Sequence, residues 1–149
     1  MTIVPFDQLK NFDLARALGG EKELPEPYHS RRLDTHAQSG DPVYFLFDDA
    51  NLVGFFVGRI IGEEAELLFI YVLTRYRRHG FGKPLLRSFI ETATAAGATV
   101  VFLEVSVKNK SALALYLSLG FKEVGLRRHY YSDGTDALLM RRQLNRVAE

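Results

Sequence analysis

The residue types and spacing that could bind a phosphate or pyrophosphate occur in one short segment, Arg77-Arg78-His79-Gly80-Phe81-Gly82. The segment follows an apolar run, Leu67–Val72, that is typical of a buried strand, and it precedes a stretch with helical periodicity. A turn from strand into helix directs several backbone N–H groups, and the positive end of the helix dipole, toward one point. Gly80 and Gly82 allow close approach of a ligand to the backbone, because they carry no side chain.

The residues after the glycines distinguish between the common phosphate loops. A Walker loop requires Gly-Lys followed by Ser or Thr, whereas Gly82-Lys83 is followed by Pro84. A dinucleotide-binding fingerprint requires a third glycine at the position where this sequence has Leu85. The remaining pattern is Arg-x-x-Gly-x-Gly, and a plain glycine-containing turn is its structural alternative.

Length and composition indicate a single globular domain that spans residues 1–149. Hydrophobic residues make up 47% and charged residues 25% of the chain, which is ordinary for a domain with a sizeable core. The net charge of +1 offers no general attraction to nucleic acid. Because the chain has no cysteine, disulfides, thiolate catalysis and cysteine-ligated metal sites are excluded.

Neither a targeting segment nor a metal site is expected. The start, Met1–Pro5, lacks the basic and apolar regions of a signal peptide, and no apolar run approaches the length of a membrane span. No group of His, Asp and Glu has metal-ligand spacing. We therefore expect a soluble, cytoplasmic protein that binds no metal, no nucleic acid and no membrane.

Periodicity and turn residues predict an α/β fold with a mixed sheet. In chain order we expect a strand at 2–5, a helix capped by Asp7, a loop at Glu21–Pro27, a weaker helix from Ser30 to Gln38, strands at 43–47, 52–61 and 65–72, a helix that ends at Gly97, a strand at 99–105, a helix capped by Asn109 or Ser111, and strands at 121–131 and 136–144.

The second half of the chain carries the most specific strings of residues. They are Phe102-Leu103-Glu104-Val105, Asn109, Ala114-Leu115-Tyr116-Leu117-Ser118-Leu119-Gly120-Phe121, Arg127-Arg128-His129-Tyr130-Tyr131 and Asp136-Ala137-Leu138-Leu139-Met140. Together with the glycine loop they resemble the GNAT superfamily of N-acetyltransferases, from about Leu52 to Leu144. The last two strings are similar to those of the RimI-like ribosomal-protein alanine N-acetyltransferases.

The resemblance implies the GNAT fold, a central mixed, mostly antiparallel sheet of about seven strands flanked by about four helices. It also implies an N-acetyltransferase that uses acetyl-CoA as co-substrate and acetylates a protein N-terminal α-amine, with a ribosomal protein as the candidate partner. Direct transfer in a ternary complex is favoured, because no cysteine can carry the acetyl group. The alternatives are acetylation of a small amine (a polyamine, an amino acid or an aminoglycoside) and a non-catalytic acyl-CoA sensor.

Acyl transfer to an amine needs a base for the amine and a proton donor for the departing thiolate. Glu104 lies near the end of the strand after the glycine-loop helix, and ligands gather at the carboxyl ends of strands in open α/β sheets. The resemblance implies that Glu104 is the general base, acting through water, and that Tyr116 is the general acid. Glu66 matches a strand glutamate of histone-type members and is the rival base. A paired surface carboxylate and a core tyrosine are the structural alternatives for Glu104 and Tyr116.

The resemblance also implies a set of residues that bind the coenzyme. They are Ile70, Tyr71 and Val72, through their backbone, then Arg77, Arg78, His79, Gly80, Phe81, Gly82 and Lys83, and finally Asn109. Asn109 could equally be only a helix cap.

Tyr130 and Tyr131 are expected to border the groove for the acceptor peptide. Adjacent residues of a strand face opposite ways, so only one of the two rings can line a cleft unless a bulge or turn redirects the other. The bulk of Phe69 and Tyr71, where RimI-like chains carry smaller residues, is expected to reshape the acceptor pocket.

Overall fold

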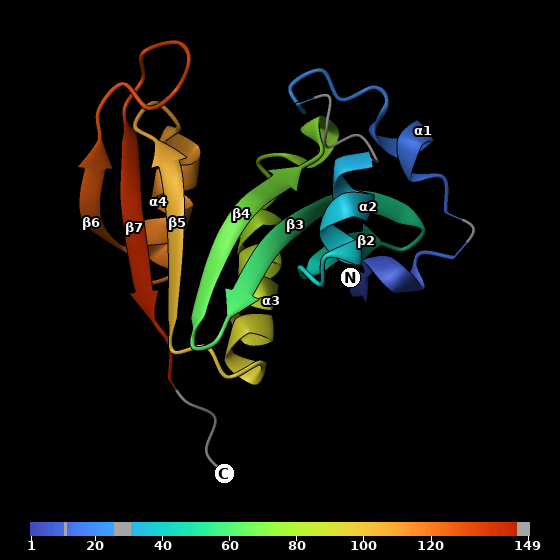
Figure 1. Cartoon of the computed structure of the whole chain (residues 1–149). Coiled ribbons are helices and arrows are strands. Elements are labelled where there is room, and N and C mark those ends of the chain that lie inside the picture. The colour runs from blue at the N-terminus through green and yellow to red at the C-terminus, as the bar shows by residue number, and fades with distance from the viewer. Residues whose placement is uncertain (11, 26–30, 146–149) are drawn as a thin grey trace. The chain divides into compact units, whose positions relative to one another are not determined.

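A computed structural model describes residues 1–10, 12–25 and 31–145 of the chain (Figure 1). Ser30, the expected cap of the second helix, lies outside these residues, as do the last two residues of the predicted loop Glu21–Pro27. No helix in the described part is both long enough and apolar enough to cross a lipid bilayer.

The described residues form seven strands and four α-helices, which confirms the predicted α/β fold. The strands are β1 (Thr2–Pro5), β2 (Val43–Asp48), β3 (Asn51–Ile61), β4 (Glu64–Val72), β5 (Val100–Ser106), β6 (Lys122–Arg127) and β7 (Ala137–Gln143). The helices are α1 (Leu14–Leu18), α2 (Arg31–Gln38), α3 (Gly82–Ala95) and α4 (Lys110–Ser118), with short 3-10 turns η1 (Phe6–Gln8) and η3 (Thr74–Tyr76). The strand order is β1-β2-β3-β4-β5-β7-β6.

The chain forms two compact units. Unit 1 contains residues 1–59 and 69–88, and unit 2 contains residues 60–68 and the chain from 89 onward. Organisation as one domain over the whole chain stays a prediction.

Unit 1 is built on antiparallel pairing of β1 with β2 and of β2 with β3. Its core is aromatic, because Phe45 and Phe55 lie opposite each other in the register of β2 and β3 and both are fully buried. Their ring centroids lie 5.8 Å apart. Burial of each such ring contributes about 1.5–3 kcal/mol, so this cluster is a main source of stability in unit 1.

Unit 2 combines parallel and antiparallel pairing. The first half of β4 pairs in parallel with β5, while β7 pairs antiparallel with both β5 and β6. Val101, Leu103 and Met140 alternate toward the core and are almost fully buried. The predicted mixed, mostly antiparallel sheet is therefore confirmed.

The first helix begins later than the sequence periodicity predicts. Asp7 lies inside η1 and caps no α-helix, whereas α1 begins at Leu14. Asp13 is the cap, and its carboxylate accepts a hydrogen bond from the backbone N–H of Arg16 at 3.0 Å. The predicted start at Asp7 is wrong because the capping oxygen comes from Asp13.

The closing hairpin is shorter than predicted. β6 ends at Arg127, not at Tyr131, because His129 has a φ of 53°, which is incompatible with an extended strand.

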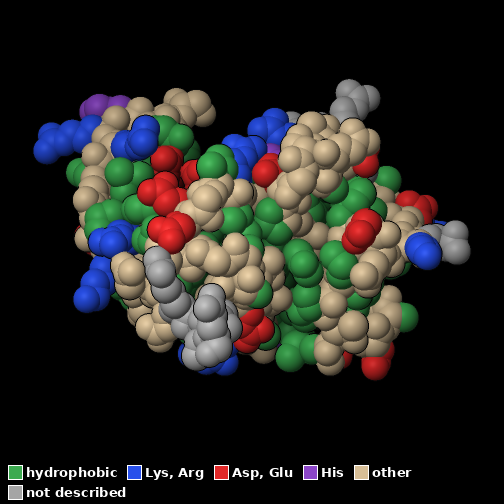
Figure 2. All heavy atoms as spheres, turned by 60° about the horizontal axis from the view of Figure 1, so that its bottom comes forward, with side chains coloured by type: hydrophobic (Ala, Val, Ile, Leu, Met, Phe, Trp, Pro, Cys, Tyr) green, Lys and Arg blue, Asp and Glu red, His purple; other side chains and the backbone are tan. Residues whose placement is uncertain are grey.

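On the face shown in Figure 2, Lys and Arg side chains occur in separate small groups between acidic and hydrophobic side chains. This mixed distribution agrees with a net charge of +1.

Gly54 of β3 fixes where the end of β4 lies within unit 1. A Cβ at Gly54 would overlap the carbonyl oxygen of Tyr71, and it would come within 3.2 Å of the Val72 Cα. The adjacent hydrogen bond, from Leu73 N to the Val53 carbonyl at 2.8 Å, holds the two backbones in this close approach.

We expect Gly54→Ala to lower the free energy of unfolding by about 1–3 kcal/mol or more, because the methyl group would displace backbone rather than a flexible side chain. Urea unfolding measures the change. Gly20→Ala is the matched control, because a Cβ at Gly20 meets nothing within 4 Å. Equal stability of the two variants would show that the end of β4 moves freely away from β3.

Candidate active site

The glycine loop lies between the end of β4 and the start of α3, as predicted. It begins at Arg77, directly after η3, and α3 starts at Gly82 with Pro84 in its first turn. Gly80 has a φ of 80°, and Arg78 has a φ of 65°, which is rare for a residue with a side chain. Such conformations concentrate at functional sites, where surrounding structure maintains them.

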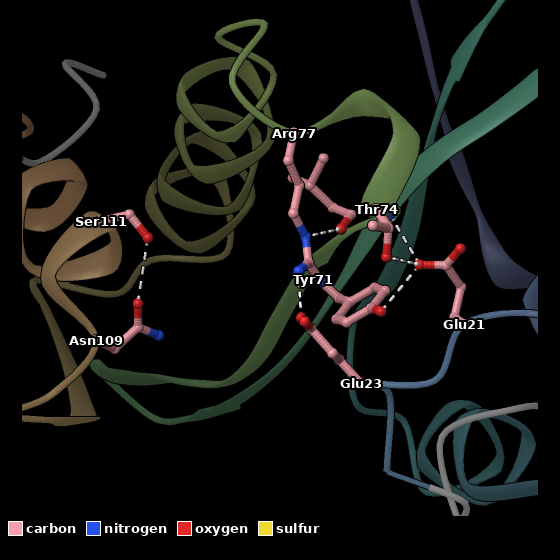
Figure 3. A network of polar contacts seen from close by, with 8 residues as sticks. Glu21, Glu23, Tyr71, Thr74, Arg77, Asn109 and Ser111 are labelled. Carbon is pink, nitrogen blue, oxygen red and sulfur yellow. Dashed lines mark hydrogen bonds and ion pairs between the residues drawn. The ribbon is translucent and has the colours of Figure 1, made fainter.

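The side chain of Arg77 turns back toward β4 (Figure 3). Its Nε donates a hydrogen bond to the Val72 carbonyl at 3.0 Å, and its guanidinium pairs with Glu23. The guanidinium carbon also lies 5.1 Å from the centroid of the Tyr71 ring. Among the residues expected to bind the coenzyme, Arg77 thus directs its side chain to the protein, and its backbone remains the candidate contact.

Phe69 and Tyr71 belong to the aromatic cluster of unit 1. Their rings stack at a centroid distance of 6.0 Å, and each lies 5.9 Å from Phe55. The side chain of Tyr71 is buried, with 7% of the residue exposed. Its phenol donates a hydrogen bond to Glu21, 50 residues earlier in the chain, at 3.0 Å.

Asn109 caps α4, which confirms one of its two proposed roles. Its Oδ1 accepts hydrogen bonds from the Ala112 N–H at 3.2 Å and from the Ser111 hydroxyl at 3.3 Å (Figure 3). Ser111 is therefore inside the helix and is not the cap. Contact of Asn109 with the coenzyme stays a prediction.

The two candidate bases lie on the same face of the β4–β5 pair in unit 2. Glu66 is in register with Phe102, and Glu104 is two residues further along β5, so their side chains point the same way. Glu66 is exposed, whereas the Glu104 side chain is 23% exposed. A hydrogen bond to Glu104 raises the pKa of Tyr130 most, and the charges of both carboxylates add to this increase.

Arg127 and Tyr130 flank the Glu104 carboxylate. The Arg127 Nε lies 3.4 Å from Glu104 Oε1, and its guanidinium carbon lies 5.5 Å from the centroid of the Tyr130 ring. A hydrogen bond to the Glu104 carboxylate is the largest cause of the raised pKa of Tyr130. The sequence marked Arg127 only as part of a family-specific string, and its contact with the candidate base was missed.

Tyr116 is a buried phenol on α4. Only 5% of the residue is exposed, and its ring packs edge-on against Phe121 at 5.7 Å. Burial raises the pKa of Tyr116 to about 12, and a smaller contribution comes from Tyr131. The phenol therefore keeps its proton at any pH at which the protein is expected to work. Its hydroxyl is a hydrogen-bond donor there, as a proton-donating role requires.

Tyr130 and Tyr131 lie side by side, because a turn redirects them. Their ring centroids are 5.1 Å apart with an interplanar angle of 83°. The positive φ of His129 makes the turn, and the Asp136 carboxylate accepts a hydrogen bond from the His129 N–H at 2.8 Å. The Tyr131 N–H then bonds to the Thr135 carbonyl at 3.1 Å. Burial is the largest cause of the raised pKa of Tyr131, and the charge of Glu104 contributes to the raised pKa of Tyr131 as well as to that of Tyr130, so both rings lie in its electrostatic field.

Each unit therefore brings together one part of the predicted site. Unit 1 holds the glycine loop and the backbone of Ile70, Tyr71 and Val72. Unit 2 holds Asn109 and the group formed by Glu66, Glu104, Tyr116, Tyr130 and Tyr131. The second group contains a carboxylate and a protonated phenol, the two types of side chain that acyl transfer to an amine requires.

Residues 9–121 match the family model described as Acetyltransferase (GNAT) family. The [Ribosomal protein bS18]-alanine N-acetyltransferase of Escherichia coli strain K12 is 38% identical over 132 residues, which cover 79% of this chain and 89% of the relative. An N-alpha-acetyltransferase of Sulfurisphaera tokodaii is 36% identical over 131 residues, which cover 78% of each chain.

Solved structures agree with these relatives. The ribosomal-protein-S18-alanine N-acetyltransferase from Escherichia coli has a TM-score of 0.81 to this chain at 30% identity, and the match covers 99% of this chain and 96% of that one. Ard1 from Thermoplasma volcanium has a TM-score of 0.75 at 28% identity, and the match covers 97% of each chain.

We expect His129→Val to destabilise the tyrosine-bearing turn, because a β-branched residue at positive φ costs about 1–3 kcal/mol. Hydrogen exchange of the Tyr131 amide should accelerate at least about tenfold. His129→Gly should keep the amide protected, and Arg128→Val is the control for loss of a polar side chain. Unchanged exchange in His129→Val would show that the positive φ does not hold the turn.

Proposed function

This chain belongs to the acetyltransferase (GNAT) family, and we propose that it transfers the acetyl group of acetyl-CoA to the α-amine at a protein N-terminus. The observation that carries the proposal is the group in unit 2, where Glu104, buried Tyr116 and the redirected tyrosine pair gather. The names of the bS18-alanine and N-alpha relatives support the α-amine as acceptor. Cytoplasmic location stays a prediction.

In the proposed reaction Glu104 accepts the proton of the attacking amine through water. An N-terminal amine has a pKa near about 8, so a substantial fraction is already neutral at physiological pH and one carboxylate base suffices. A lysine side chain, with a pKa near about 10.4, is almost fully protonated at this pH and would need a stronger general base. Glu66 lies on the same face, so only substitution separates the two candidate bases.

In this proposal Tyr116 stabilises the departing thiolate. Because its pKa is raised to about 12, the phenol enters each cycle protonated. Complete transfer of its proton to a thiolate, whose conjugate thiol has a pKa near about 8.5, would be uphill. The main contribution of Tyr116 is then a hydrogen bond to the sulfur as negative charge develops there.

The glycine loop is the proposed site for the pyrophosphate of acetyl-CoA. Backbone N–H groups from Arg78 to Gly82, together with the first turn of α3, supply the donors and the positive helix end that such an anion requires. The backbone of Ile70, Tyr71 and Val72, and the amide of Asn109, are the proposed contacts of the pantetheine arm. Transfer is direct, because the chain has no cysteine to carry an acetyl group.

The favoured acceptor is the α-amine of a protein N-terminus that begins with alanine, in a ribosomal protein or in another protein. Beside the candidate base lie two phenol rings and an arginine, which suit the backbone and side chains of a peptide. A polyamine pocket would instead need several acidic side chains around a long cation.

We expect an alanine-starting peptide to be acetylated faster than spermidine or an aminoglycoside, as measured by mass spectrometry with acetyl-CoA as donor. Tyr131→Ala should lower peptide turnover more than it lowers acetyl-CoA affinity. Strong acetylation of a polyamine, with none on any peptide, would contradict the acceptor assignment and leave the family membership intact.

We expect Glu104→Gln to lower kcat by about 100-fold or more and to remove the acidic limb of the pH–rate profile. Tyr116→Phe keeps the packed ring and should lower kcat by about 100-fold with little change in acetyl-CoA affinity. Glu66→Gln is the matched control and should stay within roughly threefold of the parent enzyme. Loss of activity in Glu66→Gln alone would assign the base to Glu66.

A further inference from the structure

Glu21 links the segment after α1 to the start of the glycine loop, although the sequence gives it no assigned role. Its Oε1 accepts hydrogen bonds from the Thr74 N–H at 2.8 Å, from the Thr74 hydroxyl at 2.9 Å and from the Tyr71 phenol at 3.0 Å (Figure 3). One carboxylate oxygen thus joins the end of β4 to the first residue of η3.

Glu23 makes a second link from the same segment. Its carboxylate pairs with the guanidinium of Arg77, the first residue of the glycine loop, and that guanidinium also bonds to the Val72 carbonyl. Glu23 is 68% exposed at its side chain, so this pair is weaker than the contacts of Glu21. The two glutamates hold both ends of η3, the turn that leads from β4 into the glycine loop.

The electrostatics agree with this arrangement. Partial burial acts to raise the pKa of Glu21, but the hydrogen bonds from Thr74 and Tyr71 and the charge of Arg77 outweigh it, so the pKa is lowered. Burial and the bond to Glu21 raise the pKa of Tyr71. Glu21 is therefore ionised and Tyr71 is neutral near pH 7, which are the states that these hydrogen bonds require.

The backbone that these contacts fix is the backbone assigned to coenzyme binding. Thr74 lies three residues before Arg77, and the Tyr71 side chain is buried against Phe55 and Phe69, so neither end of η3 can shift without breaking packing or hydrogen bonds. A pyrophosphate loop works through preorganised N–H groups, and movement of its first residues would misdirect them.

We propose that Glu21 is a positioning residue for the coenzyme loop, acting through Thr74 and Tyr71 to hold the backbone that receives acetyl-CoA. The proposal rests on the proposed function of that loop. Glu21 therefore increases the affinity for acetyl-CoA, and it takes no part in the transfer chemistry or in binding the acceptor amine.

The test measures the Kd of acetyl-CoA by calorimetry without acceptor, and then KM and kcat with a peptide acceptor. Glu21→Gln removes the charge and should raise the Kd and KM of acetyl-CoA about three- to tenfold, with kcat at saturation nearly unchanged. Glu21→Ala should have a larger effect. Thr74→Val removes one of the donors and should raise the same constants by a smaller factor.

The double variant Glu21→Gln with Thr74→Val provides the sharper readout. Because both changes act on one contact, their combined effect on Kd should be smaller than the product of the single effects. A merely structural role would lower thermal stability without this selective, non-additive change in coenzyme affinity. Lys22→Gln is the control, since it alters charge in the same segment outside these contacts.

Two outcomes would overturn the proposal, and they are distinguishable. If the unsubstituted enzyme binds acetyl-CoA and acetylates a peptide, but Glu21→Gln and Thr74→Val keep its Kd within about twofold, the role of Glu21 is wrong while the function stands. If the unsubstituted, folded chain binds no acetyl-CoA, the proposed function fails, and the role of Glu21 fails with it. Should Glu21→Ala not fold, Thr74→Val and Tyr71→Phe test the same contacts.

Discussion

The close approach of β4 to Gly54 is the constraint on which unit 1 depends. Because no side chain separates the two backbones, the end of β4 can lie directly against β3, and the Tyr71 ring is directed into the aromatic cluster. That position presents the Tyr71 phenol to Glu21 and the Val72 carbonyl to Arg77. The glycine loop then begins from a backbone that packing and hydrogen bonds have already fixed, and fixed N–H groups are what an anion site needs.

In unit 2 a turn determines where the side chains of the candidate site lie. A strand that continued through Tyr131 would place adjacent tyrosines on opposite faces. The positive φ of His129, held by the Asp136 carboxylate, ends the strand and brings both rings to the side of Glu104. Strained backbone conformations concentrate at functional sites, and here the strain sets which side chains surround the candidate base.

The sequence predicted those features that local chemistry determines. Glycine spacing after a strand identified the loop, and Asn109 was one of two candidate caps because its oxygen can accept a hydrogen bond from an N–H only three residues away. The strand and helix order followed from periodicity. Glu21 was assigned only to a loop, because its partners Tyr71 and Thr74 lie 50 and 53 residues further along the chain and no periodicity marks it. The predicted strand ran on to Tyr131, and the turn that redirects the two tyrosines was left open as an alternative, because the bond from His129 to Asp136 that accompanies this turn spans seven residues.

The carboxylates of Glu21 and Glu104 differ in how freely their hydrogen-bond and ion-pair partners can move. Glu21 accepts three hydrogen bonds on one oxygen, from donors that packing or backbone holds in place, and against the effect of partial burial these bonds and the charge of Arg77 lower its pKa and favour the ionised form. Glu104 instead faces Arg127 at 3.4 Å and Tyr130, whose exposed fractions are 54% for the arginine side chain and 49% for the tyrosine. Half-exposed partners can move aside for water and an amine at little cost. A base must be reached by water and the amine, whereas a positioning carboxylate must keep its donors in place, so this difference in partner mobility supports the separate roles proposed for the two glutamates.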